Sequence, residues 1–279
     1  MPELPEVETT KRGIEAYVVD NKITKVIIRH FSLRWPIDPD LASILDGRTI
    51  TGLSRRGKYL LFQTDSGCLI IHLGMSGKLR ILQKQQAKTV LKHDHVDIEF
   101  KDGYVLRYND PRRFGAVLWI DNDPEQHQLL RYLGPEPLTD EFDKAYLWQQ
   151  IQSRSSSIKA VIMNSKIVVG VGNIYANEAL FLAGIHPKTV ANQLTIQHCQ
   201  QLVAQIKLVL DRAIQAGGTT LKDFRKADGK QGYFAQELNV YGREGQACFH
   251  CGSEIKHFKE TQRATFYCPL CQLSDSTKA

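Results

Sequence analysis

Four of the six cysteines fall into two closely spaced pairs near the end of the sequence. Cys248 and Cys251 form the first pair, Cys268 and Cys271 form the second, and 16 residues separate the pairs. Each pair can sit on one tight turn, and a hairpin between the turns would bring the four thiolates together. This is the ligand set that tetrahedral Zn²⁺ prefers. The spacing therefore predicts one structural zinc ion.

Chemistry of a different kind is possible at the start of the sequence, where Met1 is followed by Pro2 and Glu3. A small second residue normally permits removal of the initiator methionine, which would expose the secondary amine of a proline. An α-amino group has a pKa of about 8, so part of it is neutral at pH 7. Its attack on C1′ of a deoxyribose would give an iminium ion that favours β-elimination, with Glu3 as acid or base. Many proteins start Met-Pro-Glu, and these residues alone are more typical of an ordinary helix start.

Lys256, Lys259 and Arg263 lie between the two cysteine pairs. Projecting cations suit contact with phosphate, although a solvated charged face explains them equally well. The net charge is +6, from 36 basic and 30 acidic residues. This mild excess is compatible with a polyanionic partner and does not require one.

The elements that must position these groups change character halfway along the chain. A helix over 4–17 is expected first, followed by eight strand-like runs without helices between them, which favours an antiparallel β-sandwich or barrel. A polar segment with three prolines then leads into a helical half. Strands are predicted over 23–29, 49–54, 58–64, 68–73, 78–82, 95–100, 104–109 and 115–120, and helices over 140–154, 174–183 and 195–216.

The composition is that of a globular protein, with 42% hydrophobic and 24% charged residues. The longest apolar runs are too short to span a bilayer, and the acidic, proline-bearing start is unlike a secretory signal. We therefore expect a soluble intracellular protein. Cys68 in an apolar strand and Cys199 on an apolar helix face are predicted to be core residues.

Taken in order, the motifs of this chain resemble those of the bacterial formamidopyrimidine-DNA glycosylase family, also described as 8-oxoguanine-DNA glycosylase/abasic-site lyase. The match runs from Pro2 to about Gln272, and the opening Pro2-Glu3-Leu4-Pro5-Glu6 sides with this purine-repair branch rather than with the related endonuclease VIII group. Besides the four cysteines, the motifs are MPELPEVETT (1–10), RRGKYLL (55–61), HLGMSG (72–77), KHDHVD (92–97), NDPRRFG (109–115), VGVGNIYANE (169–178) and DGKQGYFAQELNVYGREG (228–245).

The resemblance implies an α+β fold: an N-terminal antiparallel β-sandwich with the catalytic helix (1–122), a helical helix–two-turn–helix domain (132–236) and a four-cysteine zinc finger (237–273). It implies base-excision repair of oxidised purines in duplex DNA, followed by β,δ-elimination at the abasic site. Damaged double-stranded DNA would be the partner, with one structural Zn²⁺, no nucleotide cofactor and no membrane. We expect a monomer in the bacterial cytoplasm or another reducing compartment that contains DNA.

The same resemblance implies roles for particular residues. Pro2 would be the Schiff-base nucleophile and Glu3 the acid/base group. Lys58, at the start of a strand, would act near the lesion and in β-elimination. Arg263 would contact phosphate and assist δ-elimination.

Further implied positions contact DNA. An extruded nucleotide leaves a hole in the base stack, and Met75, Arg112 and Phe114 match the family's insertion residues: an apolar plug, a cation and an aromatic wedge. His93 matches a DNA-contacting histidine. The loop 217–232, rich in glycine and lysine, matches the segment that closes over the extruded base.

Phosphate contacts are implied in the helical half. The glycines of 169–172 would let backbone approach a phosphate, with Asn173 capping the following helix. Lys159 matches a phosphate-binding lysine. Because serines occupy 155–157 where a basic run is expected, Arg154 is the candidate for the missing contact.

Two other functions fit parts of the pattern. A non-catalytic DNA-binding protein could retain the finger and the helical region, and an enzyme of this architecture could act mainly on oxidised pyrimidines. The intact Pro2, Glu3 and Lys58 favour an enzyme over a binding protein.

Overall fold

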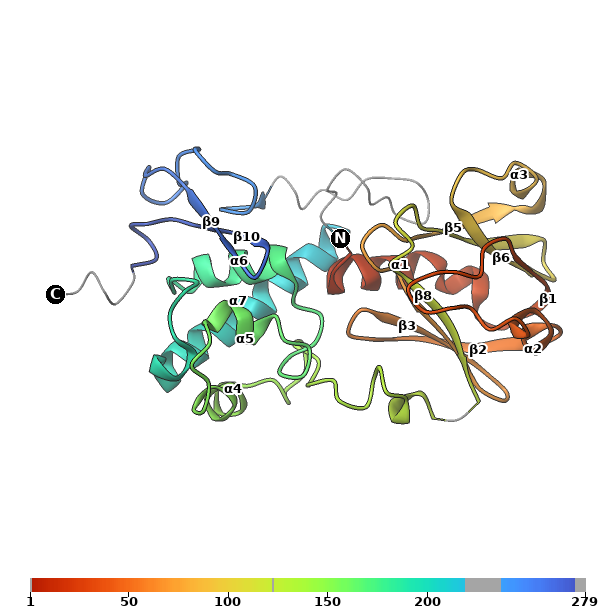
Figure 1. Ribbon diagram of the computed structural model, residues 1–279, viewed down its shortest axis with the longest axis horizontal. Helices are drawn as coiled ribbons and strands as arrows, with labels where there is room; N and C mark the ends of the chain where they lie inside the picture. Colours follow the sequence, from red (N-terminus) through yellow and green to blue (C-terminus); the bar gives the residue numbers. More distant parts are fainter. Residues whose placement is uncertain (1, 122, 219–236, 274–279) are drawn as a thin grey trace. The chain divides into compact units, whose positions relative to one another are not determined.

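The computed structural model, drawn in Figure 1, describes residues 2–121, 123–218 and 237–273. The described chain forms two compact units. One is rich in strands and runs to Tyr132, taking in also the residues that follow Gln215. The other holds residues 133–215 and the described residues from Glu237 onward. The loop expected over 217–232 lies almost entirely outside the described residues.

The first helix, α1 (Leu4–Val18), starts with a reciprocal capping arrangement. The carboxylate of Glu3 accepts from the backbone N–H of Glu6, and the Glu6 carboxylate accepts from the N–H of Glu3 at 2.8 Å. Pro5 lies in the first turn, where its missing N–H costs no helical hydrogen bond. Glu3, directly after the candidate amine, is therefore held in one place by the helix start.

The strand-rich unit contains one continuous antiparallel sheet of eight strands, in the order β5-β7-β6-β1-β2-β3-β4-β8. The strands are β1 (Asn21–Ile28), β2 (Thr49–Arg56), β3 (Tyr59–Thr64), β4 (Cys68–His72), β5 (Lys78–Gln83), β6 (Asp94–Phe100), β7 (Tyr104–Asn109) and β8 (Ala116–Ile120). All eight expected strands are confirmed within one or two residues at each end. Two short helices, α2 (Leu41–Leu45) and α3 (Lys84–Ala87), were not expected, because elements this short show no helical periodicity.

The sheet folds over at β1, which changes partner along its length. Asn21 and Lys22 pair with β2, whereas the residues from Ile23 onward pair with β6, and the register shifts between Ile23 and Lys25. One apolar cluster contains residues from both halves of the sheet together with Val7 and Ile14 of α1. Two sheet halves around a shared core are the arrangement expected of the β-sandwich, and α1 belongs to that core.

The second unit is helical and ends in a hairpin. Its elements are α4 (Lys144–Ile151), α5 (Ile158–Ile162), α6 (Asn173–Leu182), the 3-10 turn η2 (Ala191–Gln193), α7 (Ile196–Gln215), β9 (Lys256–Glu260) and β10 (Arg263–Tyr267). A further 3-10 turn, η1 (Pro124–Gln126), lies near the end of the continuous part of the first unit. The apolar face of α7 is buried, including Cys199 at 0% exposure, as Cys68 is at 2% in β4. Both cysteines are core residues, as predicted. No helix in the described part of the chain is long and apolar enough to cross a membrane.

Two helix starts differ from the sequence expectation. The helix predicted over 140–154 is only α4, because the Asp143 side chain accepts from the N–H of Tyr146 at 2.7 Å and caps it there. Asn173 does not cap α6: the helix begins at Asn173 itself, after Gly172, and the Asn173 amide donates to the carbonyl of Ala264 at 3.0 Å. The side chain of Asn173 thus makes a hydrogen bond to a distant segment and does not cap α6.

Candidate catalytic centre and nucleic-acid interface

The candidate catalytic groups of the strand-rich unit lie directly before α1 and in the turn of the β2–β3 hairpin. Pro2 is buried and Glu3 is 1% exposed. Lys58 lies in the two-residue turn of the hairpin, one residue before β3 rather than at its start. The turn depends on Gly57, whose φ of +57° falls in the left-handed region that favours glycine.

An ion pair ties that hairpin to the helix. Arg55 of β2 donates to Glu8 of α1 at 2.9 Å, and Arg12 donates to the other oxygen of Glu8 at 3.0 Å. Burial by itself would raise the pKa of Glu8, but the hydrogen bonds from Arg55 and Arg12 and the charges of Arg55 and Lys11 outweigh it, so the net pKa is lowered. Glu8 is therefore ionised at pH 7, and the pair links the helix that carries Pro2 to the strand that precedes Lys58.

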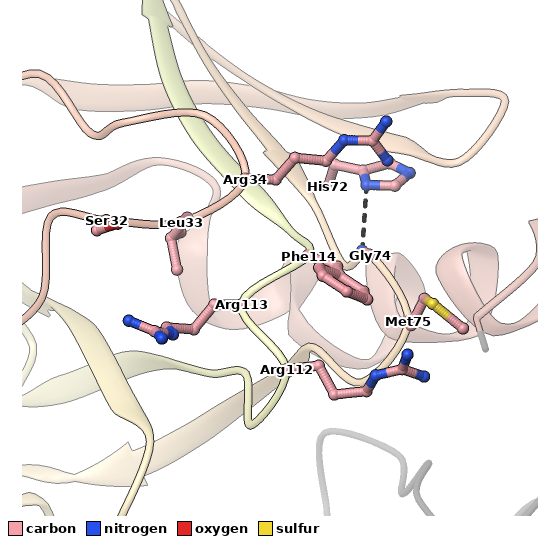
Figure 2. A pocket seen from close by; sticks show the side chains of 9 residues that line it. All are labelled: Ser32, Leu33, Arg34, His72, Gly74, Met75, Arg112, Arg113 and Phe114. Atoms are coloured by element: carbon pink, nitrogen blue, oxygen red, sulfur yellow. Dashed lines mark hydrogen bonds between the residues drawn. The ribbon is translucent and has the colours of Figure 1, made fainter.

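His72, the first residue of the HLGMSG motif, received no role from the sequence. Its Nδ1 accepts from the N–H of Gly74 at 3.1 Å (Figure 2). Its ring lies 4.7 Å from that of Tyr59 between centroids. Burial, followed by the charges of Lys58 and Arg34, lowers the pKa of His72 to about 4. The ring is therefore neutral at pH 7, and with Nδ1 accepting, Nε2 carries the proton. The sequence feature that could have pointed to His72 is its position at the end of a buried strand, β4.

We expect His72 to make folding stability sensitive to acid. The unfolded chain binds this proton near pH 6.5, whereas the folded chain resists it until about pH 4. The contribution of His72 is therefore fully present above pH 6.5 and is lost as pH falls toward 4, by at most about 1.4 kcal/mol per pH unit. His72→Asn removes the titrating group and should flatten this part of the profile, measured by urea unfolding from pH 7 to 4. His198→Asn, which alters an exposed histidine, should keep the slope; an unchanged slope in His72→Asn would contradict the expectation.

Met75, Arg112 and Phe114 lie on two neighbouring loops (Figure 2). Met75 is 36% exposed and Phe114 is 41% exposed, so neither belongs to the core. The Arg112 guanidinium lies over the Phe114 ring, 4.9 Å from its centroid. The structure brings the three residues together, and with six others they line a pocket of about 600 Å³: Ser32, Leu33, Arg34, His72, Gly74 and Arg113.

Close packing of these loops depends on Gly74, and Gly74→Ala should therefore be strongly destabilising. A Cβ there would lie 2.4 Å from the carbonyl carbon of Phe114, which adds about 1–3 kcal/mol to about 1–2 kcal/mol for alanine at φ +61°. Gly103→Ala is the matched control, since φ is +89° but nothing lies within 4 Å. Urea unfolding should show the larger loss for Gly74→Ala, and equal losses would contradict close loop packing.

His93 is held by a buried network in the same unit. Its backbone is left-handed, with φ +72°, and its carbonyl accepts from the N–H of Asp110 at 3.1 Å. Arg107, 1% exposed, donates to the carbonyls of Ala87 and Thr89 at 2.6 and 2.7 Å. Asp97 anchors the same guanidinium at 2.7 Å. These hydrogen bonds hold the segment before His93 against strands β6 and β7.

In the helical unit, Lys159 and Asn173 are directed at β10. Lys159 is 2% exposed and donates to the Thr265 hydroxyl at 2.6 Å and to the Ala264 carbonyl at 3.4 Å. Asn173 donates to the same carbonyl, while its own Oδ1 is buried without a hydrogen-bond partner among the described residues. Both side chains support the strand that begins at Arg263, and their contact with phosphate stays a prediction.

The β9–β10 hairpin presents Arg263 beside a tight turn. Thr261 and Gln262 have φ of +44° and +64°, which is the backbone of a two-residue hairpin loop that follows the natural strand twist. Arg263 is exposed and pairs in register with Glu260. Arg154 lies after α4 and donates to the carbonyl of Gln150 at 2.7 Å. The roles of both arginines on DNA stay predictions.

The four predicted ligands form one cluster. The Sγ atoms of Cys248, Cys251, Cys268 and Cys271 all lie within 4.8 Å of one another. Cys248 and Cys271 are 3.9 Å apart, and Cys251 and Cys268 are 3.4 Å apart. Sulfur ligands at about 2.3 Å from one tetrahedral ion would be about 3.8 Å apart. The cysteines therefore fit a single tetrahedral metal ion.

These features place the chain in a class, the two-domain α+β DNA glycosylases that carry a four-cysteine finger. Residues 1–117 match the model of the formamidopyrimidine-DNA glycosylase N-terminal domain, and residues 133–225 match that of the formamidopyrimidine-DNA glycosylase H2TH domain. The chain belongs to the formamidopyrimidine-DNA glycosylase family, and it is an enzyme of base-excision DNA repair.

Individual relatives are similar over almost the whole chain. A formamidopyrimidine-DNA glycosylase of Hydrogenovibrio crunogenus is 55% identical over 278 residues, which is 99% of either chain. A Lactococcus lactis FPG mutant bound to Fapy-dG-containing DNA superposes with a TM-score of 0.91 at 36% identity, covering 98% of this chain and 100% of that one. Lactococcus lactis Fpg bound to DNA with an abasic site gives 0.90 at 36% identity, with the same coverage.

Proposed function

We propose that this protein excises oxidised purines, 8-oxoguanine and formamidopyrimidines, from duplex DNA and cleaves the resulting abasic site by β,δ-elimination. The similarity over 98% of the chain to the Lactococcus lactis protein bound to Fapy-dG-containing DNA carries the proposal. The buried, capped Glu3 beside Pro2 supports it, because a helix start that fixes this carboxylate also fixes the neighbouring amine.

Pro2 is the nucleophile in the proposed mechanism, after removal of Met1. Its amine forms a bond to C1′ while the bond from C1′ to the base breaks, and proton transfer from Glu3 to the ring oxygen opens the sugar. The cationic iminium then acidifies the C2′ proton. Loss of that proton breaks the bond from C3′ to the 3′ phosphate, and a second elimination breaks the bond from C5′ to the 5′ phosphate.

Lys58 and Arg263 complete the proposed catalytic set. Lys58 projects from the hairpin turn that Arg55 and Glu8 fasten to α1, so it shares a rigid support with Pro2. Lys58 acts near the lesion and in β-elimination. Arg263 holds phosphate and assists δ-elimination, as its exposure beside the hairpin turn allows.

DNA is bound by two sets of residues. Met75, Arg112 and Phe114 fill the space left by the extruded nucleotide, and the exposure of the two apolar side chains supports this role. The cations and polar groups that contact the strand are His93, Arg154, Lys159 and Asn173. Because phosphate contacts release counterions, binding weakens steeply with salt.

The four cysteines hold one structural Zn²⁺, which organises the finger and takes no part in the elimination steps. We propose that the enzyme acts as a monomer on damaged double-stranded DNA in the bacterial cytoplasm. It uses no nucleotide cofactor, since an amine and carboxylates supply the chemistry.

The proposal is tested by incubating the protein with an 8-oxoguanine:cytosine duplex and sodium borohydride. A covalent protein–DNA adduct and strand cleavage are the expected result, since borohydride reduces an imine to a stable amine. Adduct on an abasic duplex alone would mean that the lesion class is wrong, and a duplex with an oxidised pyrimidine then identifies the substrate. If none of the three duplexes gave an adduct or strand cleavage, the protein would be a DNA-binding protein without catalytic activity.

A further inference from the structure

We propose that Ser76 and Asp110 form a latch that makes the two insertion loops, 73–77 and 110–115, act as one rigid piece. Both are positioning residues for excision from duplex DNA. The inference rests on the proposed function, because a fixed pair of loops matters only if Met75, Arg112 and Phe114 enter the DNA stack.

Asp110 lies at the centre of the latch and is 0% exposed. One carboxylate oxygen accepts from the Ser76 hydroxyl at 2.6 Å. The other accepts from the N–H of Gly115 at 2.9 Å and from the Tyr108 hydroxyl at 3.1 Å. A single buried carboxylate thus binds the loop that carries Met75, the last residue of the loop that carries Arg112, and the strand β7 that precedes that loop.

Ser76 joins the loops a second time. Its hydroxyl donates to Asp110 and accepts from the backbone N–H of Arg112 at 3.1 Å. The serine therefore bridges the insertion loops directly, one residue after Met75 and at the backbone of Arg112. The loops could separate only by removing one hydrogen-bond partner from a buried carboxylate and the Ser76 partner from the N–H of Arg112, which is unfavourable.

The loops also touch backbone to backbone. A Cβ on Gly74 would meet the carbonyl carbon of Phe114 at 2.4 Å and the nitrogen of Gly115 at 2.5 Å. A Cβ on Gly115 would meet the carbonyl oxygen of His72 at 2.5 Å. With no side chain between them, the loops have one packing arrangement, and the latch hydrogen bonds select it.

Rigid support matters here because the inserted side chains are exposed. Met75 and Phe114 are more than one third exposed, so they have few neighbours of their own to orient them. Fixing their backbones before DNA arrives reduces the ordering that binding must impose. Loss of the latch should therefore slow steps that separate the lesion from its partner strand and spare chemistry that needs no separation.

Ser76→Ala and Tyr108→Phe are the test pair. Each removes one hydroxyl bonded to Asp110, but only the Ser76 hydroxyl also binds the backbone of Arg112. The other contact of the Tyr108 hydroxyl is a longer one, 3.5 Å, to the carbonyl of His72 in β4. In single-turnover excision from an 8-oxoguanine:cytosine duplex, we expect Ser76→Ala to be slower by about 10- to 100-fold, as for loss of a hydrogen bond to a charged group. Tyr108→Phe should stay within about threefold of wild type. Thermal unfolding of both variants tests whether they fold as the wild type does.

Two further measurements separate loop positioning from general damage. Borohydride trapping on a single-stranded abasic oligonucleotide involves no partner strand, so Ser76→Ala should match wild type. The fluorescence of 2-aminopurine placed opposite an abasic-site analogue rises on insertion, and Ser76→Ala should reduce that rise. This fluorescence measurement does not depend on catalysis.

Three results would overturn the latch: undiminished duplex excision by Ser76→Ala, an equal loss on single-stranded and duplex substrates, or the same selective loss in Tyr108→Phe. Failure of the proposed function would look different. The wild-type protein itself would then excise no purine lesion, while the 2-aminopurine comparison would still decide whether Ser76 positions the loops on bound DNA.

Discussion

Pro2→Gly should form almost no borohydride-trapped adduct with an 8-oxoguanine:cytosine duplex and should lose at least about 10³-fold in cleavage rate. Proline offers a secondary amine whose ring fixes its orientation before α1. Glycine offers a primary amine without a ring, so its orientation is not fixed. Borohydride trapping and strand cleavage both require the iminium, so both should be lost together. Peptide mapping of the wild-type adduct should place the crosslink at the N-terminal residue.

Pro5→Ala is the matched control for this substitution. Pro5 is also a buried proline, in the first turn of α1, but its nitrogen is an amide that cannot attack a sugar. Alanine is well tolerated in a first turn, so activity should stay within about threefold of wild type. A wild-type adduct that maps to a lysine peptide, or a Pro2→Gly adduct that maps anywhere but the N-terminal glycine, would show that Pro2 is not the nucleophile.

Glu3→Gln should separate the two steps that Pro2 links. Glutamine can still accept from the N–H of Glu6, so the helix start is retained. It cannot take up or release a proton, so ring opening should slow by roughly 10²- to 10⁴-fold. The amine remains present, and slow trapping on an abasic duplex should persist where that of Pro2→Gly does not.

Cys268→Ser should abolish zinc binding and with it the folding of the finger. Cys268 is 0% exposed and lies within 3.4 Å of Cys251 Sγ, so its thiolate faces the metal position. Binding of a structural zinc ion is worth on the order of 10 kcal/mol of folding free energy in small fingers. Without it, the β9–β10 hairpin that presents Arg263 should lose its fixed geometry. The zinc content measured by elemental analysis should fall from one ion per chain to none, and the affinity for DNA should fall by at least about 10-fold.

Cys199→Ala provides the control for the loss of a buried thiol. Cys199 is equally buried, on α7, but lies outside the cluster. The variant should keep one zinc ion per chain and should lose only the stability that a small core truncation costs. Zinc retained by Cys268→Ser would mean that the cluster does not coordinate through all four thiolates. A metal other than zinc in the wild-type protein would correct the identity of the ion and leave the ligand set unchanged.

Features that depend on neighbours in the chain could be predicted from the sequence. The eight strands followed from short alternating runs between turn residues, and the metal cluster followed from two pairs at a fixed spacing. The helix starts at α4 and α6 were misplaced. Asp143 caps α4 by accepting from the N–H of Tyr146, and the side chain of Asn173, predicted to cap α6, donates to the carbonyl of Ala264 instead. Sequence spacing shows where a cap is possible, but it does not show which candidate residue caps the helix or whether a distant segment binds that side chain instead.

The sequence by itself determined the family, the order of the motifs, the four thiolates and the identity of the candidate amine and carboxylate. Only the tertiary structure decided that Ser76 meets Asp110, 34 residues away, and that Lys159 donates to Thr265, 106 residues away. It also decided that His72 is neutral at pH 7, through its burial and the charges of Lys58 and Arg34. Chemistry along the chain follows residue type, but the environment that shifts a pKa or fixes a loop is built from distant segments, and only packing brings those together.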